Sequence, residues 1–504
     1  GGLSPWRGPG AEPLVGLGAK PPLAKTMTKA RRPLPLIVPQ VTPPLSLAVL
    51  LEQASCQTNV PIQLGLERVL RLLERMGNPQ QELDCIHVAG TNGKGSVLAF
   101  LGAMLRHAGY RVGLYTSPHL HCVNERIQVA GQWITDDSLA RWLSAVLTAN
   151  AGAAATFFEL LTVVAFCHFR DQGLGRTEAG RGIVLLETGL GGRLDATNVI
   201  EPLVSIITSI SLDHTDYLGA ELTAIATEKA GIFKPAVPAL AASGRPEVEE
   251  LLRRQAQKQG TPLAILGKEF FLCPPLSFLP PLAAPDGTIP ADATWWFQEG
   301  GICQELPRPG LSGRHQLENA ALAIAGVHRL RQAGWPVDDA AMVAGVRDAR
   351  WPGRLERFSL PGQDGQLRTV LLDGAHNPSG CLSLANFLRE STSPDRHSTR
   401  LLFAAVQDKP VEEMARILLP YVDEVWVTRI GGERGYPAAF LAALWQGLGR
   451  PAHPCATPAE GLAAALAAAP PGGEVVVCGS LYLVGAVRAI LRPDMPRDKI
   501  AFSR

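Results

Sequence analysis

The sequence has few charged residues and no excess of either sign. Charged side chains make up 18% of the 504 residues, and 47 basic residues against 46 acidic ones give a formal net charge of +1. A typical soluble domain contains about 25% charged residues. Because the charges nearly balance, the composition excludes a general polyanion-binding surface, and we expect no nucleic-acid partner.

Paired cysteine motifs and long apolar segments are also missing. The nine cysteines are an odd number and contain no Cys-x-x-Cys pair, which argues against a disulfide framework and against a zinc cluster. A membrane-spanning helix needs about 20 apolar residues, and the longest charge-free run, residues 33–51, contains five prolines. We therefore expect a reduced, cytoplasmic protein without a membrane span.

Residues 1–43 are poor in acidic side chains. Glu12 stands alone against six basic residues, and the segment contains nine prolines and six glycines. Such a segment buries too little apolar surface to offset the entropy lost on ordering, so we expect a disordered N-terminal extension. The first methionine is Met27, and a start of translation there is one expectation. A transit peptide is the alternative, although hydroxyl residues are scarce before Arg31.

The rest of the chain alternates between strand and helix patterns. Strands are expected at 83–88, 112–115, 182–186 and 204–207, and helices at 97–105, 140–147, 157–169 and 222–230. The alternation predicts an α/β domain, residues 44–349, with a central, mostly parallel sheet. Residues 273–301 are rich in proline and poorly periodic, and we expect a surface loop or insertion there.

A second α/β pattern begins after a break near Trp351. Strands are expected at 369–372, 401–405, 424–427 and 474–477, and helices at 383–389, 411–418, 438–445, 460–468 and 483–491. This predicts a smaller, Rossmann-like α/β domain over residues 350–504, which is within the common size range of domains.

The strongest chemical signal is the run Gly90-Thr91-Asn92-Gly93-Lys94-Gly95-Ser96, which joins a strand to a helix. Backbone N–H groups in such a P-loop surround phosphate oxygens, and the helix N-terminus favours negative charge. Lys94 would reach the outer phosphates and Ser96 would ligate Mg²⁺. Val88 and Gly95 depart from the strict Walker A pattern. An ordinary glycine-rich turn is the alternative, but the lysine and the flanking elements favour phosphate.

Four other positions are candidate site residues, although each has an ordinary explanation. Ser117 follows a strand, at the sheet edge where α/β sites form. Glu159, at the start of a helix, is either a favourable N-terminal charge or a cation ligand. His214 alone is more often a satisfied polar group than a ligand. Lys229 near the end of a helix is usually dipole compensation.

Taken in order, these and further motifs resemble the folylpolyglutamate synthase/dihydrofolate synthase family of the Mur-ligase superfamily. The resemblance extends over residues 66–488, and each motif is weak alone whereas the ordered set is specific. The motifs lie at residues 90–96, 117–120, 124–127, 187–198, 213–214, 228–232, 315–319, 351–354 and 373–378. The resemblance implies a P-loop ATP-binding domain followed by a glutamate-ligase domain.

The implied reaction is ATP-dependent amide formation between L-glutamate and the carboxylate of dihydropteroate or of a reduced folyl-(poly)glutamate. ATP first converts the carboxylate into an acyl phosphate, and the glutamate nitrogen then displaces phosphate. Because negative charge accumulates along this path, the site should supply cations and fixed donors. The family implies ATP and Mg²⁺ as cofactors and a monomer. No residue in the sequence decides between dihydrofolate synthase, folylpolyglutamate synthase or both, and we expect the bifunctional form because bacterial members of the family often carry out both reactions.

The resemblance also assigns roles to residues. Those implied in catalysis are Lys94, Lys229, His214 and His376, and Lys229 matches a lysine that is carbamylated in the family. Those implied in ATP binding are residues 90–96 with Asn319, Arg354 and Asp373. The implied magnesium ligands are Ser96, Ser117, Glu159 and His214. The substrate residues implied are Asn124, Glu125, Arg126 and Asp195.

Two alternatives stay open from the sequence. Another Mur-superfamily ligase would share ATP, Mg²⁺ and the lysine but act on a UDP-sugar or peptide carboxylate. The Lys94-Gly95-Ser96 variant and the 373–378 motif favour the folate branch instead. A nucleotide-regulated binding protein without turnover is the second alternative. The presence of Lys94, Glu159, His214 and Lys229 argues against it.

Overall fold

The computed structural model describes residues 45–56, 65–177, 180–273, 295–361, 365–391 and 399–494. The extension predicted at residues 1–43 lies outside these ranges. All the described residues belong to one compact unit.

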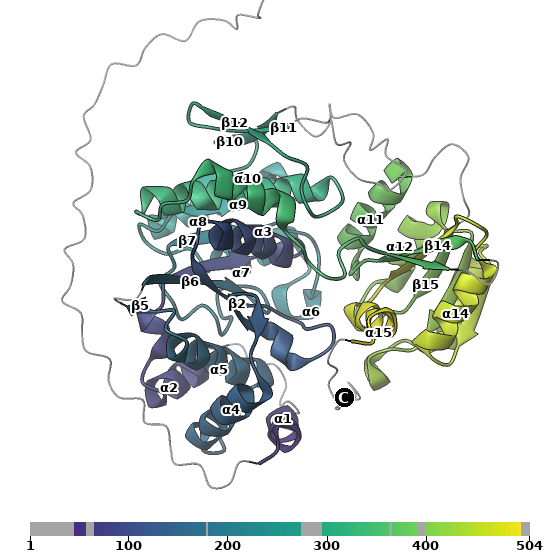
Figure 1. The fold of residues 1–504 in the computed structure, drawn as a ribbon, viewed down its shortest axis with the longest axis horizontal. Helices are drawn as coiled ribbons and strands as arrows, with labels where there is room; N and C mark the ends of the chain where they lie inside the picture. The colour runs from purple at the N-terminus through teal and green to yellow at the C-terminus, as the bar shows by residue number, and fades with distance from the viewer. Residues whose placement is uncertain are drawn as a thin grey trace, which may run out of the picture. The chain divides into compact units, whose positions relative to one another are not determined.

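A nine-stranded sheet organises the N-terminal part of the chain (Figure 1). Its strands are β1 (Cys85–Ala89), β2 (Arg111–Tyr115), β3 (Ile127–Val129), β4 (Gln132–Trp133), β5 (Arg176–Thr177), β6 (Gly180–Glu187), β7 (Val204–Ile207), β8 (Ala239–Ala241) and β9 (Leu263–Ile265). The order is β4-β3-β2-β6-β1-β7-β8-β9, and β5 pairs with β6. From β2 to β9 the pairs along this path are parallel, whereas β3, β4 and β5 are antiparallel additions. The predicted mostly parallel sheet is confirmed.

The helices of this part include those predicted from the periodicity at 97–105, 140–147, 157–169 and 222–230. They are α1 (Leu47–Cys56), α2 (Glu67–Arg75), α3 (Lys94–His107), α4 (Asp136–Asn150), α5 (Phe157–Asp171), α6 (Thr215–Leu218), α7 (Leu222–Ala230), α8 (Pro246–Gln259), α9 (His315–Gln332) and α10 (Asp339–Asp348). Val97, Leu101 and Met104 of α3 are fully buried in the core shared with α9 and α10. Burial of each such side chain contributes about 1.5–3 kcal/mol.

None of the helices in the described ranges combines the length and the apolar character that crossing a bilayer requires.

A small antiparallel sheet replaces part of the predicted loop. It consists of β10 (Phe270–Cys273), β11 (Trp295–Glu299) and β12 (Ile302–Leu306). The expectation of a loop was wrong for 295–299, because Trp295 and Phe297 alternate inward and are buried, and the Phe297 ring packs edge-on against His328 of α9. Residues 274–294 lie outside the described ranges.

A six-stranded sheet organises the C-terminal part. Its elements are β13 (Glu356–Pro361), β14 (Leu367–Leu372), α11 (Pro378–Ser391), β15 (Thr399–Phe403), α12 (Val411–Leu418), β16 (Glu424–Thr428), α13 (Ala438–Gly447), β17 (Ala452–Cys455), α14 (Pro458–Ala468), β18 (Glu474–Cys478) and α15 (Leu481–Leu491). The order is β13-β14-β18-β15-β16-β17, and every neighbouring pair except β13–β14 is parallel. Apolar clusters cover both faces, as in a Rossmann-like domain. The predicted boundary at 349/350 falls between α10 and β13 and stays a prediction.

Candidate active site

The carboxyl ends of four parallel strands meet at one edge of the first sheet. Strand β1 leads into the glycine-rich loop, β2 into Ser117, β6 ends at Glu187, and β7 leads towards Asp213 and His214. The register places Val88 beside Glu187 and Ala89 beside Ile207. A cavity of about 180 Å³ lies where these segments converge, which is the expected place for a site in an α/β fold.

Two glycines of the loop meet specific steric demands. Gly93 has a φ of +93°, and a Cβ there would lie 2.5 Å from Asn319 Oδ1. A Cβ on Gly95 would lie 2.7 Å from the indole Nε1 of Trp351. The departure from the strict Walker A pattern at Gly95 therefore has a physical reason, since the first turn of α3 packs against the segment that precedes the second sheet.

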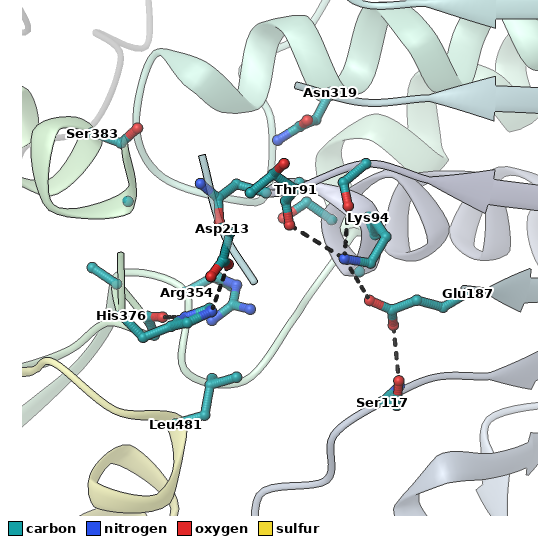
Figure 2. Close-up of a pocket in the computed structure, with 18 of the residues that line it drawn as sticks. Thr91, Lys94, Ser117, Glu187, Asp213, Asn319, Arg354, His376, Ser383 and Leu481 are labelled. Atoms are coloured by element: carbon teal, nitrogen blue, oxygen red, sulfur yellow. Dashed lines mark hydrogen bonds and ion pairs between the residues drawn. The ribbon is translucent and has the colours of Figure 1, made fainter. Parts of the chain in front are cut away.

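Lys94 begins α3 and folds back over the loop. Its Nζ donates to the carbonyls of Gly90 (3.1 Å) and Thr91 (3.2 Å) and lies 3.8 Å from Glu187 Oε1 (Figure 2). Oε2 of Glu187 accepts the backbone N–H of Ser117 at 3.2 Å. Burial raises the pKa of the Glu187 carboxyl, and Lys94 with the Ser117 N–H partly offsets that rise. A cation, a buried carboxylate and the Ser117 segment thus lie together at the loop.

The structure places Glu187, rather than Glu159, in this group. Glu159 Oε2 accepts the backbone N–H of Thr156 at 2.7 Å, and the Thr156 hydroxyl accepts the N–H of Glu159 in return. Its carboxylate also pairs with Arg68 at 3.0–3.3 Å. This is the N-terminal helix charge that the sequence offered as the ordinary alternative. Glu187 was missed, although its place at the end of a parallel strand was the available signal.

Asp213 links the two sheets. Its Oδ1 accepts from Lys409 Nζ at 2.6 Å, and its Oδ2 accepts from Asn377 Nδ2 at 2.9 Å. Burial alone would raise the pKa of Asp213, but Lys409 and the two neighbouring imidazoles outweigh it and hold that pKa well below its usual range. The adjacent His214 is exposed and lines the cavity. Sequence reasoning singled out neither Lys409 nor a role for Asp213.

Lys229, near the end of α7, is a buried lysine that lines the same cavity. Burial, together with the nearby charge of Lys94, lowers the pKa of its ammonium to about 7. A substantial neutral fraction at physiological pH distinguishes it from an ordinary lysine that compensates a helix dipole, because a neutral amine is nucleophilic.

The side chains around the phosphate loop could supply some of the ligands of a metal ion whose remaining ligands are phosphate oxygens. Within the described ranges, no group of three His, Cys, Asp or Glu side chains is arranged to hold a metal ion. Ser96, Ser117, Glu187 and His214 nevertheless line one cavity with the phosphate loop. Since Mg²⁺ usually takes one or two carboxylates and completes its shell with water and substrate phosphates, a single buried carboxylate fits this ion.

Residues from α9 and the second sheet form the opposite wall. Asn319, Arg354, Asp373 and His376 all line the cavity. Both carboxylate oxygens of Asp373 accept backbone N–H groups, from Leu355 at 3.0 Å and Ala375 at 2.9 Å. Asp373 therefore fixes the segments on which Arg354 and His376 lie.

The protonation of His376 follows from its contacts. Its Nδ1 lies 2.7 Å from the carbonyl oxygen of Gly374, which can only accept, so Nδ1 carries the proton. Burial lowers the pKa of the imidazole to about 4. The unprotonated Nε2, 3.8 Å from Asp213 Oδ2, is therefore available as an acceptor.

A second, larger cavity of about 530 Å³ adjoins the first. The two share Ser117, His214 and His376 among their lining residues. Phe157, Phe158, Leu190 and Leu194 give the second cavity apolar walls, and the Arg126 guanidinium lies 5.7 Å from the centre of the Phe157 ring. Such walls suit a flat aromatic group, with polar groups at one end.

Two of the four predicted substrate residues do not reach either cavity formed by the described residues. Asn124 donates to the Ile134 carbonyl and to Asp136, and Glu125 accepts three backbone N–H groups from residues 120–122. These side chains hold the loop after Ser117 in place, and direct substrate contact by either stays a prediction. Arg126 and Asp195 line the second cavity, but Asp195 accepts the N–H groups of Gly189 and Leu190 and so positions that loop.

Comparison with known proteins agrees with this geometry. The family model "Mur ligase, glutamate ligase domain" matches residues 353–481. The fold and the site thus define an ATP-dependent ligase of the Mur type. The chain is 35% identical to dihydrofolate synthase/folylpolyglutamate synthase of Bacillus subtilis, over 71% of this chain and 79% of that protein. It is 32% identical to the Escherichia coli protein of the same name, over 85% and 92%.

Solved structures give the same result. Escherichia coli FolC in complex with DHPP and ADP superposes with a TM-score of 0.77 and 31% identity, covering 90% of this chain and all of that one. The bifunctional enzyme of Yersinia pestis with AMPPNP and a manganese ion gives a TM-score of 0.75 at 31% identity and the same coverage. The chain belongs to the folylpolyglutamate synthase/dihydrofolate synthase family.

Proposed function

We propose that this protein adds L-glutamate both to dihydropteroate and to reduced folyl-(poly)glutamates, with ATP as the phosphoryl donor. The observation that carries the proposal is the junction of the two cavities at Ser117, His214 and His376. A nucleotide in the first cavity and an aromatic acceptor in the second would meet at that junction. The names of the relatives, and the DHPP and ADP bound by the Escherichia coli protein, support the same pair of ligands.

The side chains suit the chemistry of an acyl phosphate. An oxygen of the acceptor carboxylate attacks the γ-phosphorus, and ADP leaves. Lys94 would move to the outer phosphates and offset the charge that develops there. Ser96, Ser117, Glu187 and His214 would hold Mg²⁺, which when bound supplies a Lewis acid for phosphate oxygens. Arg354 would contact phosphate bidentately from the opposite wall.

The second half-reaction takes place at the same junction. The glutamate nitrogen attacks the acyl carbon, the C–O bond to phosphate breaks, and inorganic phosphate leaves with that oxygen. His376 Nε2 would accept a hydrogen bond from the amine and orient it. Because the pKa of His376 is lowered to about 4, it would position the nucleophile rather than store the released proton. The walls of the cavities would exclude water from the acyl phosphate.

A panel of acceptors tests the proposal. With ATP, Mg²⁺ and L-glutamate present, dihydropteroate and tetrahydrofolate should each support ADP release, and omission of glutamate should abolish amide formation. Consumption of a UDP-sugar acceptor alone would assign the protein to another branch of Mur ligases. ATP binding without turnover on any acceptor would instead support the second alternative, a nucleotide-regulated binding protein.

Carbamylation of Lys229 is part of the proposal, and it predicts a chemical rescue. A neutral amine adds CO₂, so loading should increase as pH rises through the pKa of about 7 and the ammonium loses its proton. Lys229→Ala should lower turnover roughly 10²-fold, since it removes a charged group from the phosphate site. Formate or acetate should restore part of the lost turnover by replacing the carbamate. Full turnover by Lys229→Ala without any added carboxylate would remove the carbamate from the mechanism.

The apolar walls of the second cavity predict a selective change in acceptor affinity. Phe157→Ala removes the ring beneath Arg126, and loss of one aromatic contact of about 0.5–1.5 kcal/mol corresponds to a KM for dihydropteroate raised roughly 3- to 10-fold. The KM for ATP should stay unchanged because Phe157 does not line the first cavity. Steady-state kinetics with each substrate varied in turn measure both values, and an equal rise in the KM for ATP would contradict the assignment.

A cytoplasmic location and a monomeric state complete the proposal. The eight cysteines whose side chains the structure describes are all free thiols, and this supports a reducing compartment. Light scattering in solution measures the oligomeric state.

A further inference from the structure

Asn377 lies at the centre of a polar cluster that joins the phosphate loop to the C-terminal sheet. Its Nδ2 donates to Asn92 Oδ1 at 3.1 Å and to Asp213 Oδ2 at 2.9 Å. Its Oδ1 accepts from Asn92 Nδ2 at 3.1 Å and from the backbone N–H of Gly380 at 2.8 Å. A primary amide offers two donor hydrogens and two acceptor lone pairs, so all four are used. With 1% of its surface exposed, Asn377 has a single orientation that satisfies these partners.

A buried ion pair extends the cluster. Lys409, which follows β15 and is 6% exposed, donates to the remaining oxygen of Asp213 at 2.6 Å. Asp408 also lies 3.7 Å from its Nζ. A buried lysine without a partner is costly, so the Lys409–Asp213 pair favours the arrangement in which the two sheets are closed on each other.

The cluster touches three catalytic segments at once. Asn92 is two residues before Lys94, Asp213 is next to His214, and Asn377 is next to His376. Lys94 and His214 come from the first sheet, and His376 from the second. Any shift of one sheet against the other would therefore break the amide pair and displace His376 from the phosphate loop.

We propose that Asn377 is a positioning residue for ligation: it sets the register of the C-terminal sheet against the phosphate loop, and Lys409 stabilises that register through Asp213. The inference rests on the proposed function, since it concerns the geometry of that same reaction. It goes beyond the roles assigned above because Asn377 is not among the residues that line either cavity.

The first test separates positioning from nucleotide binding. Asn377→Ala should lower kcat about 10²-fold, the size expected for misplaced reacting groups. The Kd for AMPPNP, measured by titration calorimetry, should change less than about threefold because the loop and Lys94 remain. Circular dichroism and thermal unfolding verify the fold. A kcat within about twofold of wild type would overturn the proposal.

An isosteric pair of variants makes the test specific. Asn377→Asp keeps the shape but sets a carboxylate against Asp213 where a 2.9 Å hydrogen bond now exists, so kcat should fall at least as far as in Asn377→Ala. Adding Asp213→Asn restores one amide facing one carboxylate, and the double variant should recover about tenfold over Asn377→Asp alone. A double variant that is worse than Asn377→Asp would show a purely structural role and overturn the proposal.

Glu390→Gln is the matched control. Glu390 of α11 pairs with Arg314 at 3.0 Å, a contact between the same two parts of the chain, and neither residue lines either cavity. The kcat of the Glu390→Gln variant should stay within about twofold of wild type. If Glu390→Gln lost as much as Asn377→Ala, any lost contact between the two sheets would suffice, and Asn377 would have no special role.

Loss of ligation by the wild type and retained ligation by Asn377→Ala have different consequences. If wild type made no amide with any pteroyl acceptor, the proposed function would fail before any variant was compared. If wild type ligated glutamate normally while Asn377→Ala did so equally well, only the positioning role would fail.

Discussion

Lys94→Ala is expected to lower ligation by roughly two to three orders of magnitude while the protein stays folded. Lys94 belongs to the glycine-rich loop, and its Nζ donates to two loop carbonyls and faces Glu187. Removing one preorganised charge from a phosphoryl-transfer site lowers kcat roughly 10²–10³-fold. Both the dihydropteroate and the tetrahydrofolate reactions should fall together, because one loop serves both. ADP release at saturating substrates measures the loss.

Lys268→Ala is the control for this prediction. Lys268 is an exposed lysine paired with Glu249, away from the loop, and its removal should leave kcat unchanged. Thermal unfolding of both variants checks the fold. Turnover retained by Lys94→Ala at the wild-type rate would refute the phosphate role of this lysine.

Glu187→Gln and Glu159→Gln are expected to differ sharply in their need for magnesium. Glu187 lies in the cavity with Ser96, Ser117 and His214, whereas Glu159 is held by Arg68 and Thr156. Loss of the buried Glu187 carboxylate should lower kcat roughly 10²-fold and shift the Mg²⁺ concentration for half-maximal rate upwards. Glu159→Gln should leave that concentration unchanged and cost about 1 kcal/mol of folding stability through the weakened helix cap.

A magnesium titration of the initial rate, run on both variants, measures the difference. The opposite pattern, with Glu159→Gln needing more magnesium and Glu187→Gln behaving as wild type, would return the ligand role to Glu159. Equal shifts in both variants would show that neither carboxylate is specific for the metal.

The fold was largely predictable because its buried strands and amphipathic helices produce regular patterns of apolar residues in the amino-acid sequence. The strand at 204–207 and the helix at 222–230 have the predicted bounds. Short edge strands such as β4 carry too few residues to show a period, and the aromatic alternation of β11 was hidden by the proline-rich residues before it.

The site was predictable where consecutive residues form a recognisable loop motif. It was less predictable where the contacts join residues that are far apart in the sequence. Residues 90–96 are consecutive, so the phosphate loop is evident from the amino-acid sequence alone. Glu187 and Glu159 are both carboxylates beside apolar segments, and only the register of β6 beside β1 separates them. Lys409 and Asp213 are 196 residues apart, so no local sequence pattern predicts that they form a pair.

We expect an acyl phosphate to form where the two cavities meet. Dihydropteroate labelled with ¹⁸O in its carboxylate should transfer one ¹⁸O atom to inorganic phosphate for each amide bond formed, because the oxygen that attacks the γ-phosphorus leaves with the phosphate. Mass spectrometry of the released phosphate measures this directly. Unlabelled phosphate at full turnover would contradict the account.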